Sequence, residues 1–423
     1  MSWQKTSLCV LGLPLGTQTT PPFIPDCIRQ ADVLCGFPKT LKAFASLQKP
    51  CVPLTLPLDV SLQSLTEFLE NGQKVVILAS GDPLFYGIGA TLPRYFPKDS
   101  FTILPSVSSL QETCAKIAMP WHDVVCVSLH GRKNTMALNQ ALLSGKTICL
   151  LTDPSNTPKS LAAYLAKKGY PCTIHVFANI GTPKESYSLF SLLPDPKTAA
   201  IHVPDIPDIA PNIPMTILLE PSKKPTMPML GIPEALLSPE CYCTKAAVRA
   251  TALSLLAMRP NEIFWDIGAG SGALSLEACR LLPEGAIFAV EEKAERMAII
   301  EQHLQRFGAY TVNPVAGHAP LCLKDLPNPT RVFVGGGLSQ NDARRLLDAT
   351  TSRMAPSGRI VLACVLLQTI ALCHSYFQKK AWTYGVTLVQ TSSSTSLAND
   401  LRFGESAPVY LVWAEKPNTE QAQ

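Results

Sequence analysis

Charged residues are scarce in this sequence of 423 residues. They make up 16% of the chain against 47% for hydrophobic residues, and 36 basic residues nearly balance 32 acidic ones, which leaves a net charge of +4. A chain with this many hydrophobic and this few charged residues is not intrinsically disordered. Without a block of lysines and arginines, the sequence gives no indication of nucleic-acid binding. The length predicts two or three domains with large hydrophobic cores.

No apolar run is long enough to cross a membrane. The longest one near the C-terminus, residues 360–373, is interrupted by Gln368 and Thr369 and is typical of a buried strand followed by a helix. The first residues, MSWQKTSLCVLGLPLG, combine a lysine with an apolar run, as a signal peptide does. Their early glycine and proline and the lack of a small-residue cleavage site favour a first β-strand instead.

A metal-binding cysteine pattern is also missing. The 14 cysteines include no C-x-x-C pair, and the closest two, Cys241 and Cys243, provide too few ligands for a zinc site. We interpret the cysteines as small buried hydrophobic residues in a reducing cytoplasm. The sequence offers no Ser/His/Asp arrangement either, so it predicts no metal site and assigns no catalytic residue.

Prolines gather in the middle of the chain, with eleven from Pro194 to Pro239. Because proline fixes φ and lacks an N–H donor, this region cannot be a continuous helix or a central strand. Within it, MTILLE (residues 215–220) is apolar enough to predict an edge strand that closes a first domain. We therefore expect one domain over residues 1–220, a proline-rich linker over 221–228 and a second domain over 229–423.

Apolar runs alternate with helix-like stretches in both halves. The upstream runs are SLCVLGL, KVVILAS, FTILPS, VVCVSLH, KTICLLTD and TIHVFAN, and the downstream runs are EIFWDIGAG, AIFAVEE, TVNPVAG, RVFVGGG and GRIVLACVLL. Stretches such as AAVRATALSLLAM and DARRLLDATTSRM separate the downstream runs. This alternation predicts α/β domains, with a mostly parallel sheet in the C-terminal half. No fixed-period repeat is found, so the halves are predicted to be different domains.

A glycine-rich turn follows the run EIFWDI and contains Gly268, Gly270 and Gly272. With Ala273 it also satisfies G-x-G-x-x-A, which is typical of nicotinamide dinucleotide sites. Glycines suit any ligand that the backbone must approach closely. Glu291, 23 residues after Gly268, ends the next apolar run and suits ribose hydroxyls in a dinucleotide or in S-adenosylmethionine.

Asp266 distinguishes these ligands. A dinucleotide places a negative pyrophosphate at the following helix N-terminus, where a nearby carboxylate would repel it. S-adenosylmethionine instead carries a sulfonium and an ammonium cation. The pattern D-x-G-x-G-S-G therefore favours a class I methyltransferase over an NAD-dependent oxidoreductase, and over a tight turn that binds no ligand.

The motifs around this turn resemble those of the decarboxylating precorrin methyltransferases of cobalamin biosynthesis. GIPEALL, TKAAVRATALSLL, WDIGAGSGALSLEA, FAVEE, GHAP and VFVGGG occur here in the order of that family. The resemblance implies a Rossmann-like class I fold that binds S-adenosylmethionine through Asp266, Gly268, Gly270, Gly272, Glu291, Thr244 and Gly317. It also places Lys245 and Gly336 near the substrate. Two positions depart from the family: His318 replaces an acid, and Gln368 replaces a glutamate.

The N-terminal half contains a second compact loop, SGDPLFYGIG, which lacks the G-K-[ST] of a phosphate-binding loop. Gly-Asp-Pro alone is ordinary turn chemistry. ADVLCG, LASGDPLFYGIG, LPSVSSLQ, PWHD, SLHGR and LTDPSNTP nevertheless run in the order of the tetrapyrrole methylases. This resemblance implies a two-subdomain fold with a cofactor cleft at Gly81, Asp82 and Pro83, together with Ser106 and Ser108. It also implies that His130 and Arg132 meet substrate carboxylates, which an arginine binds through two donors.

The first strand of the N-terminal half departs from that family. The family's strand ends in G-x-G-P-G, whereas this sequence has Gly12-Leu13-Pro14-Leu15-Gly16 and so lacks the middle glycine. Because glycine permits close approach of the backbone, the fit of a ligand at this loop is altered. An active C-terminal domain beside a cofactor-poor N-terminal domain therefore stays open as an alternative.

Taken together, the chain resembles the fused, decarboxylating precorrin C5,15-methyltransferases. The resemblance implies methylation of a precorrin or cobalt-precorrin at C-5 by the N-terminal domain, and methylation at C-15 with loss of CO2 from the ring C acetate by the C-terminal domain. It also implies a homo-oligomer, a dimer or a tetramer, with no membrane or nucleic-acid partner. Such methyl transfer requires orientation, with reacting atoms held about 3–3.5 Å apart, more than a charged catalytic dyad. A non-enzymatic tetrapyrrole-binding or scaffold protein is the remaining alternative.

Overall fold

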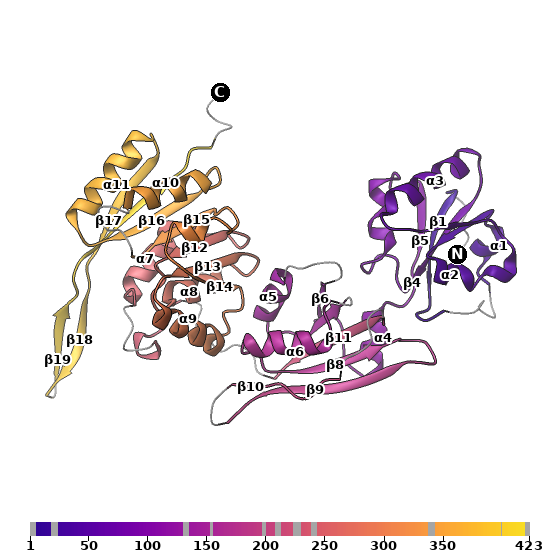
Figure 1. Cartoon of the computed structure of the whole chain (residues 1–423), viewed down its shortest axis with the longest axis horizontal. Helices are drawn as coiled ribbons and strands as arrows, with labels where there is room; N and C mark the ends of the chain where they lie inside the picture. The colour runs from indigo at the N-terminus through magenta and orange to yellow at the C-terminus, as the bar shows by residue number, and fades with distance from the viewer. Residues whose placement is uncertain are drawn as a thin grey trace.

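Three β-sheets follow one another along the long axis of the molecule (Figure 1). The computed structural model describes residues 6–17, 24–129, 135–152, 155–196, 200–207, 213–222, 230–237, 243–336, 343–398 and 400–418. The predicted α/β class is confirmed, and each predicted run contains an observed strand. The predicted linker, residues 221–228, lies outside the described residues from position 223 onward. The domain boundaries therefore stay a prediction.

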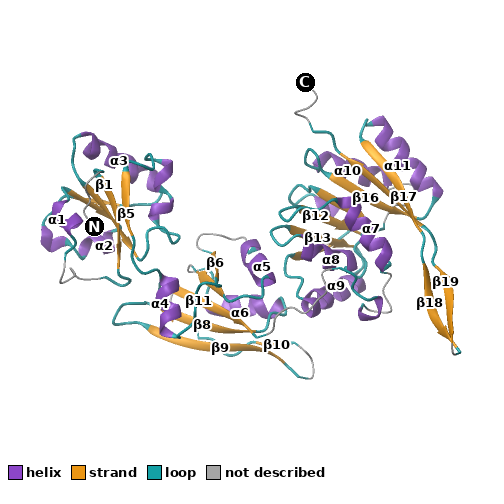
Figure 2. Ribbon diagram, turned by 180° about the vertical axis from the view of Figure 1, so that it is seen from behind, coloured by secondary structure: helices purple, strands orange, loops and turns teal. Residues whose placement is uncertain are grey.

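The first sheet is five-stranded and entirely parallel, in the order β3-β2-β4-β1-β5. Its strands are β1 (Leu8–Leu13), β2 (Val33–Gly36), β3 (Cys51–Pro53), β4 (Val75–Ser80) and β5 (Phe101–Leu104). Helices α1 (Asp26–Gln30) and α2 (Pro38–Lys42) pack on one face, and α3 (Leu58–Glu70) packs on the other (Figure 2). Cover on both faces explains why β1 and β4 are continuous apolar runs without alternation.

The second sheet is six-stranded and mixed, in the order β10-β9-β8-β11-β7-β6. Its strands are β6 (Val125–Ser128), β7 (Ile148–Leu151), β8 (Cys172–Ala178), β9 (Ser186–Pro194), β10 (Ile201–His202) and β11 (Met215–Pro221). Helix α4 (Ser109–Lys116) covers one face, and α5 (Met136–Leu143) and α6 (Pro158–Lys167) cover the other.

The prediction that residues 215–220 form an edge strand is wrong. Strand β11 lies inside the second sheet and is antiparallel to β8 on one side and to β7 on the other. The flanking prolines suggested an edge, but Pro214 precedes the strand and Pro221 is its last residue. Every N–H that the two ladders need is therefore available, and the apolar TILL segment is fully buried, as suits a central strand.

The third sheet is seven-stranded, in the order β14-β13-β12-β15-β16-β20-β17. Its five parallel strands are β12 (Ile263–Ile267), β13 (Ala286–Glu291), β14 (Val312–Ala316), β15 (Arg331–Val334) and β16 (Arg359–Cys364), and β20 (Val409–Glu415) and β17 (Thr383–Val389) complete it in antiparallel pairing. Helices α7 (Ala246–Leu256), α8 (Ala273–Leu281) and α9 (Ala294–Phe307) cover one face, and α10 (Ala343–Arg353) and α11 (Leu367–Lys379) cover the other. The prediction of a mostly parallel C-terminal sheet is confirmed.

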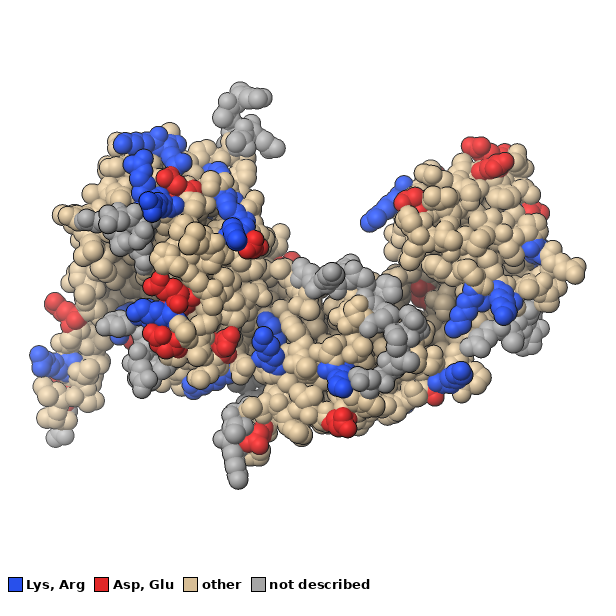
Figure 3. All heavy atoms as spheres, in the orientation of Figure 1, with Lys and Arg blue, Asp and Glu red and all other residues tan. Residues whose placement is uncertain are grey.

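A two-stranded ribbon, β18 (Ser392–Leu397) and β19 (Asp400–Glu405), extends away from the third sheet (Figure 1). None of the described helices is both long and apolar enough to pass through a bilayer. Acidic and basic side chains are interspersed over much of the face shown in Figure 3, and the surface is indented between the first sheet and the rest of the molecule.

The second and third sheets contact each other through α6 and α9. Lys168 Nζ donates a hydrogen bond to the carbonyl of Tyr310 over 3.1 Å, and burial lowers the pKa of this lysine to about 8. The rings of Tyr170 and Tyr310 pack edge to face, with centroids 5.2 Å apart. Gln305 Nε2 donates to the carbonyl of Lys167 over 3.0 Å. Burial of both tyrosines gives this contact an apolar centre.

A buried ion pair fixes the segment that precedes α7, at the start of the C-terminal half. Arg249 on α7 and Glu277 on α8 are 0% and 1% exposed, and Arg249 Nε donates to Glu277 Oε1 over 2.9 Å. The same guanidinium donates to the carbonyls of Thr244 and Ile232, each over 2.6 Å. Glu277 Oε1 also accepts from the Ile232 N–H over 3.0 Å. The pair therefore ties the segment that precedes α7 to two helices of the core.

Removing one member of this pair should destabilise the C-terminal sheet strongly. Arg249→Met leaves the Glu277 carboxylate buried without its cation, so we expect the free energy of unfolding to fall by about 3–5 kcal/mol. Differential scanning calorimetry of the full chain would record a lower transition temperature. The exposed Arg345→Met on α10 is the matched control, with an expected change within about 0.5 kcal/mol.

The double variant Arg249→Met/Glu277→Met separates charge from packing. It removes both buried charges, so we expect it to recover much of the stability that the single variant loses. A double variant no more stable than Arg249→Met would show that the polar contacts to Thr244 and Ile232, not the ion pair, dominate.

Candidate functional site

The first candidate site lies at the carboxyl ends of the parallel strands of the third sheet. A cavity of about 170 Å³ opens there between the ends of β12, β13, β14 and β15. Its lining residues are Thr244, Ile267, Gly268, Ala269, Gly270, Val290, Glu291, Glu292, Arg296, Gly317, His318, Ala319, Gly335, Gly336 and Leu346. Ligands in open parallel sheets bind in the crevice at this edge.

Gly268 and Gly270 of the glycine loop line this cavity, whereas Gly272 is the N-cap of α8 and does not line it. Gly268, Gly270 and Gly272 have φ angles of +75°, +60° and +75°, which disfavour other residues. A Cβ at position 268 would lie 2.9 Å from the Gly336 nitrogen, so the loops after β12 and β15 touch backbone to backbone. A side chain at Gly268 would therefore push these loops apart at the cavity.

Asp266 is the fourth residue of β12, and its side chain meets Ser275 in the first turn of α8. Its side chain is 1% exposed, and its Oδ2 accepts a hydrogen bond from Ser275 Oγ over 2.6 Å. Burial raises the pKa of this carboxyl to about 6, although the hydrogen bonds from Ser275 oppose the rise. Asp266 does not line the cavity. Asp266 can therefore influence a ligand in the cavity only through its charge or through the loop that it supports.

Glu291 joins the glycine loop to the second strand of the sheet. Its Oε2 accepts from the Gly270 N–H over 2.9 Å, and its Oε1 accepts from the Glu292 and Lys293 N–H groups, both over 3.1 Å. A carboxylate offers about four lone-pair sites, so one acceptor position remains after these three bonds. Glu291 lines the cavity, where a hydroxyl donor from a ligand can use that position.

The other residues predicted near this loop divide into two groups. Thr244, Gly317 and Gly336 line the cavity. Lys245 does not, and its Nζ donates to Glu234 Oε2 over 2.9 Å, which raises the pKa of the lysine. Gly337, the last residue of the VFVGGG motif, lies outside the described residues.

Sequence reasoning missed two groups here. Arg296 on α9 lines the cavity, and nothing in its local sequence marked it. Ser275 donates a hydrogen bond to Asp266, which precedes the glycine loop. Arg249, paired with Glu277, donates a hydrogen bond to the carbonyl of Thr244. Their signal was available, because each is a polar residue inside an apolar helical stretch.

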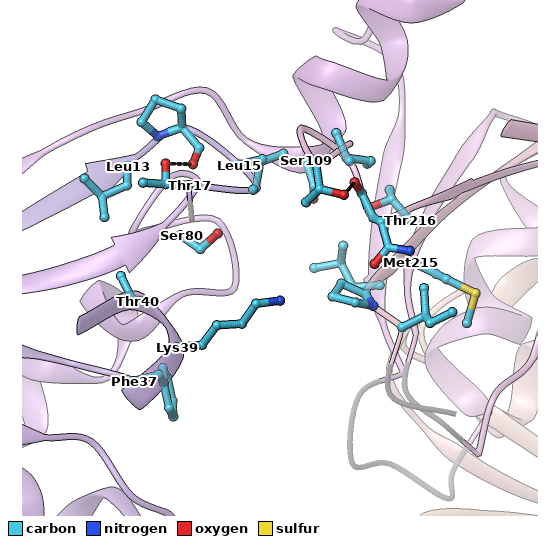
Figure 4. A pocket seen from close by; sticks show the side chains of 18 of the residues that line it. Leu13, Leu15, Thr17, Phe37, Lys39, Thr40, Ser80, Ser109, Met215 and Thr216 are labelled. Atoms are coloured by element: carbon cyan, nitrogen blue, oxygen red, sulfur yellow. Dashed lines mark hydrogen bonds between the residues drawn. The ribbon is translucent and has the colours of Figure 1, made fainter. Parts of the chain in front are cut away.

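The second candidate site is a cavity of about 600 Å³ between the first and second sheets (Figure 4). Its lining residues are Leu13, Pro14, Leu15, Gly16, Thr17, Phe37, Lys39, Thr40, Ser80, Ser109, Leu151, Thr152, Asn179, Ile180, Thr182, Ile213, Pro214, Met215 and Thr216. The first sheet contributes residues at or just past the carboxyl ends of β1, β2 and β4, and the second sheet those past β7 and β8 and at the start of β11.

The predicted Gly-Asp-Pro loop flanks this cavity without lining it. Gly81 has a φ of +70° and donates its N–H to the Leu13 carbonyl over 2.8 Å. Asp82 Oδ1 accepts from the Leu84 N–H over 2.7 Å, which closes a tight turn. Pro83 is buried behind them. The neighbouring Ser80 is the residue of this loop that lines the cavity.

The two predicted serines lie on the next loop, and neither lines the cavity. Ser108 is the N-cap of α4: its Oγ accepts from the Gln111 N–H over 3.2 Å, and its own N–H donates to Gln111 Oε1 over 2.9 Å. Ser106 packs against the backbone of Gly12, where a Cβ would lie 2.7 Å away. The neighbouring Ser109 lines the cavity instead. His130 and Arg132 lie outside the described residues.

The loop after β1, which lacks the family's middle glycine, contacts the second sheet at the loop after β8. A Cβ at Gly16 would lie 2.4 Å from the Gly181 carbonyl, so the backbones of the β1 and β8 loops are in contact. Leu15 turns its side chain toward Gly81, where a Cβ would be 3.0 Å from Leu15 Cδ2. Pro14 stands at the position of the family's middle glycine and lines the cavity, and Leu15, at the position of the family's proline, fills the space beside the Gly-Asp-Pro loop.

Two families match separate parts of the chain. Residues 20–192 match the family described as Tetrapyrrole (Corrin/Porphyrin) Methylases. Residues 238–411 match the family described as Precorrin methyltransferase domain. The first match covers the lining of the 600 Å³ cavity from Phe37 to Thr182 but not the β1 loop before residue 20, and the second covers the glycine loop of the other cavity.

Curated relatives agree with this division. A cobalt-precorrin-6B C(15)-methyltransferase (decarboxylating) from Salmonella typhimurium is 30% identical over 41% of this chain and 88% of its own. A cobalt-precorrin-7 C(5)-methyltransferase from the same organism is 30% identical over 38% of this chain and 79% of its own. A precorrin-6Y C(5,15)-methyltransferase [decarboxylating] from Mycobacterium tuberculosis (strain CDC 1551 / Oshkosh) is 30% identical over 309 residues, which are 72% of this chain and 74% of its own. The chain therefore belongs to the family of decarboxylating precorrin-6Y C(5,15)-methyltransferases.

Proposed function

We propose that this chain transfers methyl groups from S-adenosylmethionine to C-5 and C-15 of a precorrin or cobalt-precorrin and removes CO2 from the ring C acetate. The observation that carries the proposal is the pairing of two family matches with two separate cavities, each at the carboxyl edge of a parallel set of strands. The N-terminal domain, residues 1–220, methylates C-5. The C-terminal domain, residues 229–423, methylates C-15 and decarboxylates. The protein acts in the cytoplasm as a dimer or tetramer.

The C-terminal cavity suits S-adenosylmethionine. When it is bound, S-adenosylmethionine supplies an electrophilic methyl group on its sulfonium sulfur. The glycine loop lets the backbone approach a ligand closely, since a Cβ at Gly268 would already touch Gly336. Asp266 and Glu291 bring two carboxylates to this loop, which favour a cation and hydroxyl donors and disfavour a pyrophosphate. Thr244 and Gly317 complete the proposed binding set.

Asp266 and Glu291 have different tasks in this proposal. Glu291 is held by three backbone N–H groups, so it fixes the loop and offers its remaining lone pair to a ribose hydroxyl. Among the described residues, the donors to Asp266 are the Ser275 side chain and backbone, so its charge is poorly compensated. That charge attracts a cation above the loop, and burial strengthens the attraction.

The N-terminal cavity offers a different set of groups. Ser80, Ser109, Thr40 and Thr182 bring hydroxyls to its lining, and Gly81 turns the chain beside it. Gly81, Asp82, Pro83, Ser106 and Ser108 are proposed to contact the cofactor through their backbone, because their side chains cap α4, close a turn or pack on neighbouring backbone. His130 and Arg132 are proposed to bind substrate carboxylates.

Product mass spectrometry with site-specific variants tests the proposal. When the metal-free and the cobalt-containing substrates are supplied in separate reactions, we expect the wild type to add two methyl groups and release CO2 with the form that is its substrate, which the comparison identifies. Asp266→Ala should slow C-15 methylation and CO2 release at least tenfold while C-5 methylation continues, because each domain has its own cavity. Asp82→Ala should slow only C-5 methylation, at least tenfold, which is about 1.4 kcal/mol of barrier.

Exposed acids serve as matched controls for these variants. Asp400→Asn on β19 and Asp99→Ala in the loop before β5 change residues that line neither cavity, so both should keep both methylations. A wild type that adds one methyl group would favour the alternative in which only the C-terminal domain is active. An unchanged product pattern in both Asp266→Ala and Asp82→Ala would exclude the proposal and favour a scaffold.

The raised pKa of Asp266 predicts opposite effects of Asp266→Asn on stability and on binding. In the folded protein without ligand, the proton leaves Asp266 near pH 6 rather than at 3.8, so the folded state loses stability as the pH rises through this window. The neutral asparagine side chain of the variant avoids that loss. Urea unfolding should therefore show the same free energy of unfolding for Asp266→Asn and wild type near pH 4. At pH 8 the free energy of unfolding of the variant should be about 3 kcal/mol higher.

Cofactor binding should respond in the reverse direction. Isothermal titration of the full chain with S-adenosylmethionine should show the affinity of the C-terminal site rising between pH 5 and pH 7 in the wild type, as Asp266 ionises. In Asp266→Asn this affinity should be roughly tenfold weaker at pH 7 and should lose that rise. Tight NAD binding without S-adenosylmethionine binding would instead support an oxidoreductase.

A further inference from the structure

Lys39 is the one basic residue among the described residues that line the N-terminal cavity. The same set contains no aspartate or glutamate, so nothing in it opposes the positive charge. The C-terminal cavity differs, because Glu291, Glu292 and Arg296 all line it. The N-terminal cavity therefore favours an anionic ligand group, and it does so at one point.

The fold presents this lysine to the cavity. Strand β2 ends at Gly36, and Phe37-Pro38 leads directly into α2, whose second residue is Lys39. In Figure 4 the Lys39 side chain extends from α2 toward the opposite wall, where Met215 and Thr216 begin β11. Within the described part of the chain, Lys39 is exposed and has no acidic partner, whereas Lys49 nearby donates to the carbonyls of Arg29 and Ala31.

Apolar groups surround the position that the ammonium group faces. Phe37 is 44% exposed beside Lys39. Ile180, Ile213 and Met215 come from the second sheet and complete an apolar lining around the cavity. The hydroxyl oxygen of Thr152 is buried in this wall without a hydrogen-bond partner in the described structure. The cavity thus combines an apolar interior, one cation and a hydroxyl in need of a partner.

A tetrapyrrole matches this combination. Its macrocycle is broad and apolar, whereas its acetate and propionate side chains place carboxylates around the rim. We propose that Lys39 binds one of these peripheral carboxylates and thereby orients the macrocycle in the N-terminal cavity. The inference rests on the proposed C-5 methylation, to which it adds a substrate-binding residue. An ammonium on a flexible stem suits this task, because it can follow a carboxylate without a fixed planar geometry.

Lys42 provides a matched control for a test of this proposal. It lies on the same helix, is exposed as Lys39 is, and does not line the cavity. Lys39→Met and Lys42→Met therefore make the same change of charge and length three residues apart. Lys39→Arg keeps the charge and serves as the conservative variant. Methylation at C-15 in the same chain reports whether each variant is folded and competent.

Steady-state kinetics of C-5 methylation give the first measurement. For Lys39→Met we expect the KM of the tetrapyrrole to rise roughly threefold to fivefold, as the loss of one partly solvated ion pair would cause. The KM for S-adenosylmethionine and the rate of C-15 methylation should stay at wild-type values. Lys39→Arg should recover most of the loss, and Lys42→Met should behave as wild type. Equal tetrapyrrole KM values for Lys39→Met and Lys42→Met would overturn the proposal.

Direct binding separates failure of this inference from failure of the proposed function. Uroporphyrin III, a porphyrin with carboxylates on every side chain, is titrated into the full chain and followed by its absorbance, with its methyl ester as the uncharged probe. Lys39→Met should weaken the binding of the acid and leave that of the ester unchanged. If the wild type forms no C-5 product but this difference appears, the Lys39 site stands and the C-5 assignment fails. If C-5 product forms and the acid binds equally to Lys39→Met and Lys42→Met, the Lys39 site fails and the C-5 assignment stands.

Discussion

The loops that follow parallel strands all lie at one edge of the sheet, the edge formed by the carboxyl ends of the strands. Both cavities depend on this constraint. In the first sheet the pairs Leu13 with Ser80 and Gly36 with Leu78 bring three strand ends to the same level. In the third sheet Ile267 pairs with both Val290 and Val334. The next residues along the chain therefore meet across the edge, so that Gly268 touches Gly336. Register, set by the hydrogen-bond ladders, decides which loop residues can share a ligand.

The cavities at the carboxyl edges of the third and first sheets differ in the sign of the charge near them. The C-terminal edge holds two buried carboxylates, and they are compensated to different degrees. Three backbone N–H groups satisfy most of Glu291. Burial raises the pKa of Asp266, and the hydrogen bonds from Ser275 offset only part of that rise. Such an uncompensated buried charge destabilises the empty fold and favours a cation that restores the balance. The N-terminal edge instead carries hydroxyls and a single lysine, which suits a neutral or anionic ligand surface.

Much of this fold was predictable from sequence, because apolar runs and glycine turns are local signals. The strands that flank the glycine loop, and the loop itself, lie where the pattern placed them. β11 was misassigned to an edge because proline density was averaged over a region, whereas only the positions inside the strand matter. β9 and the ribbon of β18 and β19 carry weak apolar patterns, with mostly exposed side chains, so periodicity could not find them.

The site was less predictable, because a lining residue is defined by contacts between distant segments. Motif order located the two loops, but the residues that line the N-terminal cavity are Ser80 and Ser109, each one position from a predicted residue. Lys39 had no signal in the sequence, since an exposed lysine on a short helix is usually only solvated. Its significance comes from the second sheet, whose β8 and β11 loops close the cavity opposite it.

The orientation of the third sheet also governs how the two activities relate. Residues at its amino edge, Ile263, Thr311 and Asn313, line a cavity of about 530 Å³ together with Thr135 and Met136 at the start of α5. The second sheet therefore adjoins the amino edge, whereas the glycine loop lies at the carboxyl edge, a strand length of roughly 17–20 Å away. In the proposed function, a tetrapyrrole that moves between the two cavities of one chain therefore travels around the third sheet. The two cavities share no lining residue, which agrees with the names of the relatives that match one half of the chain and carry one activity each.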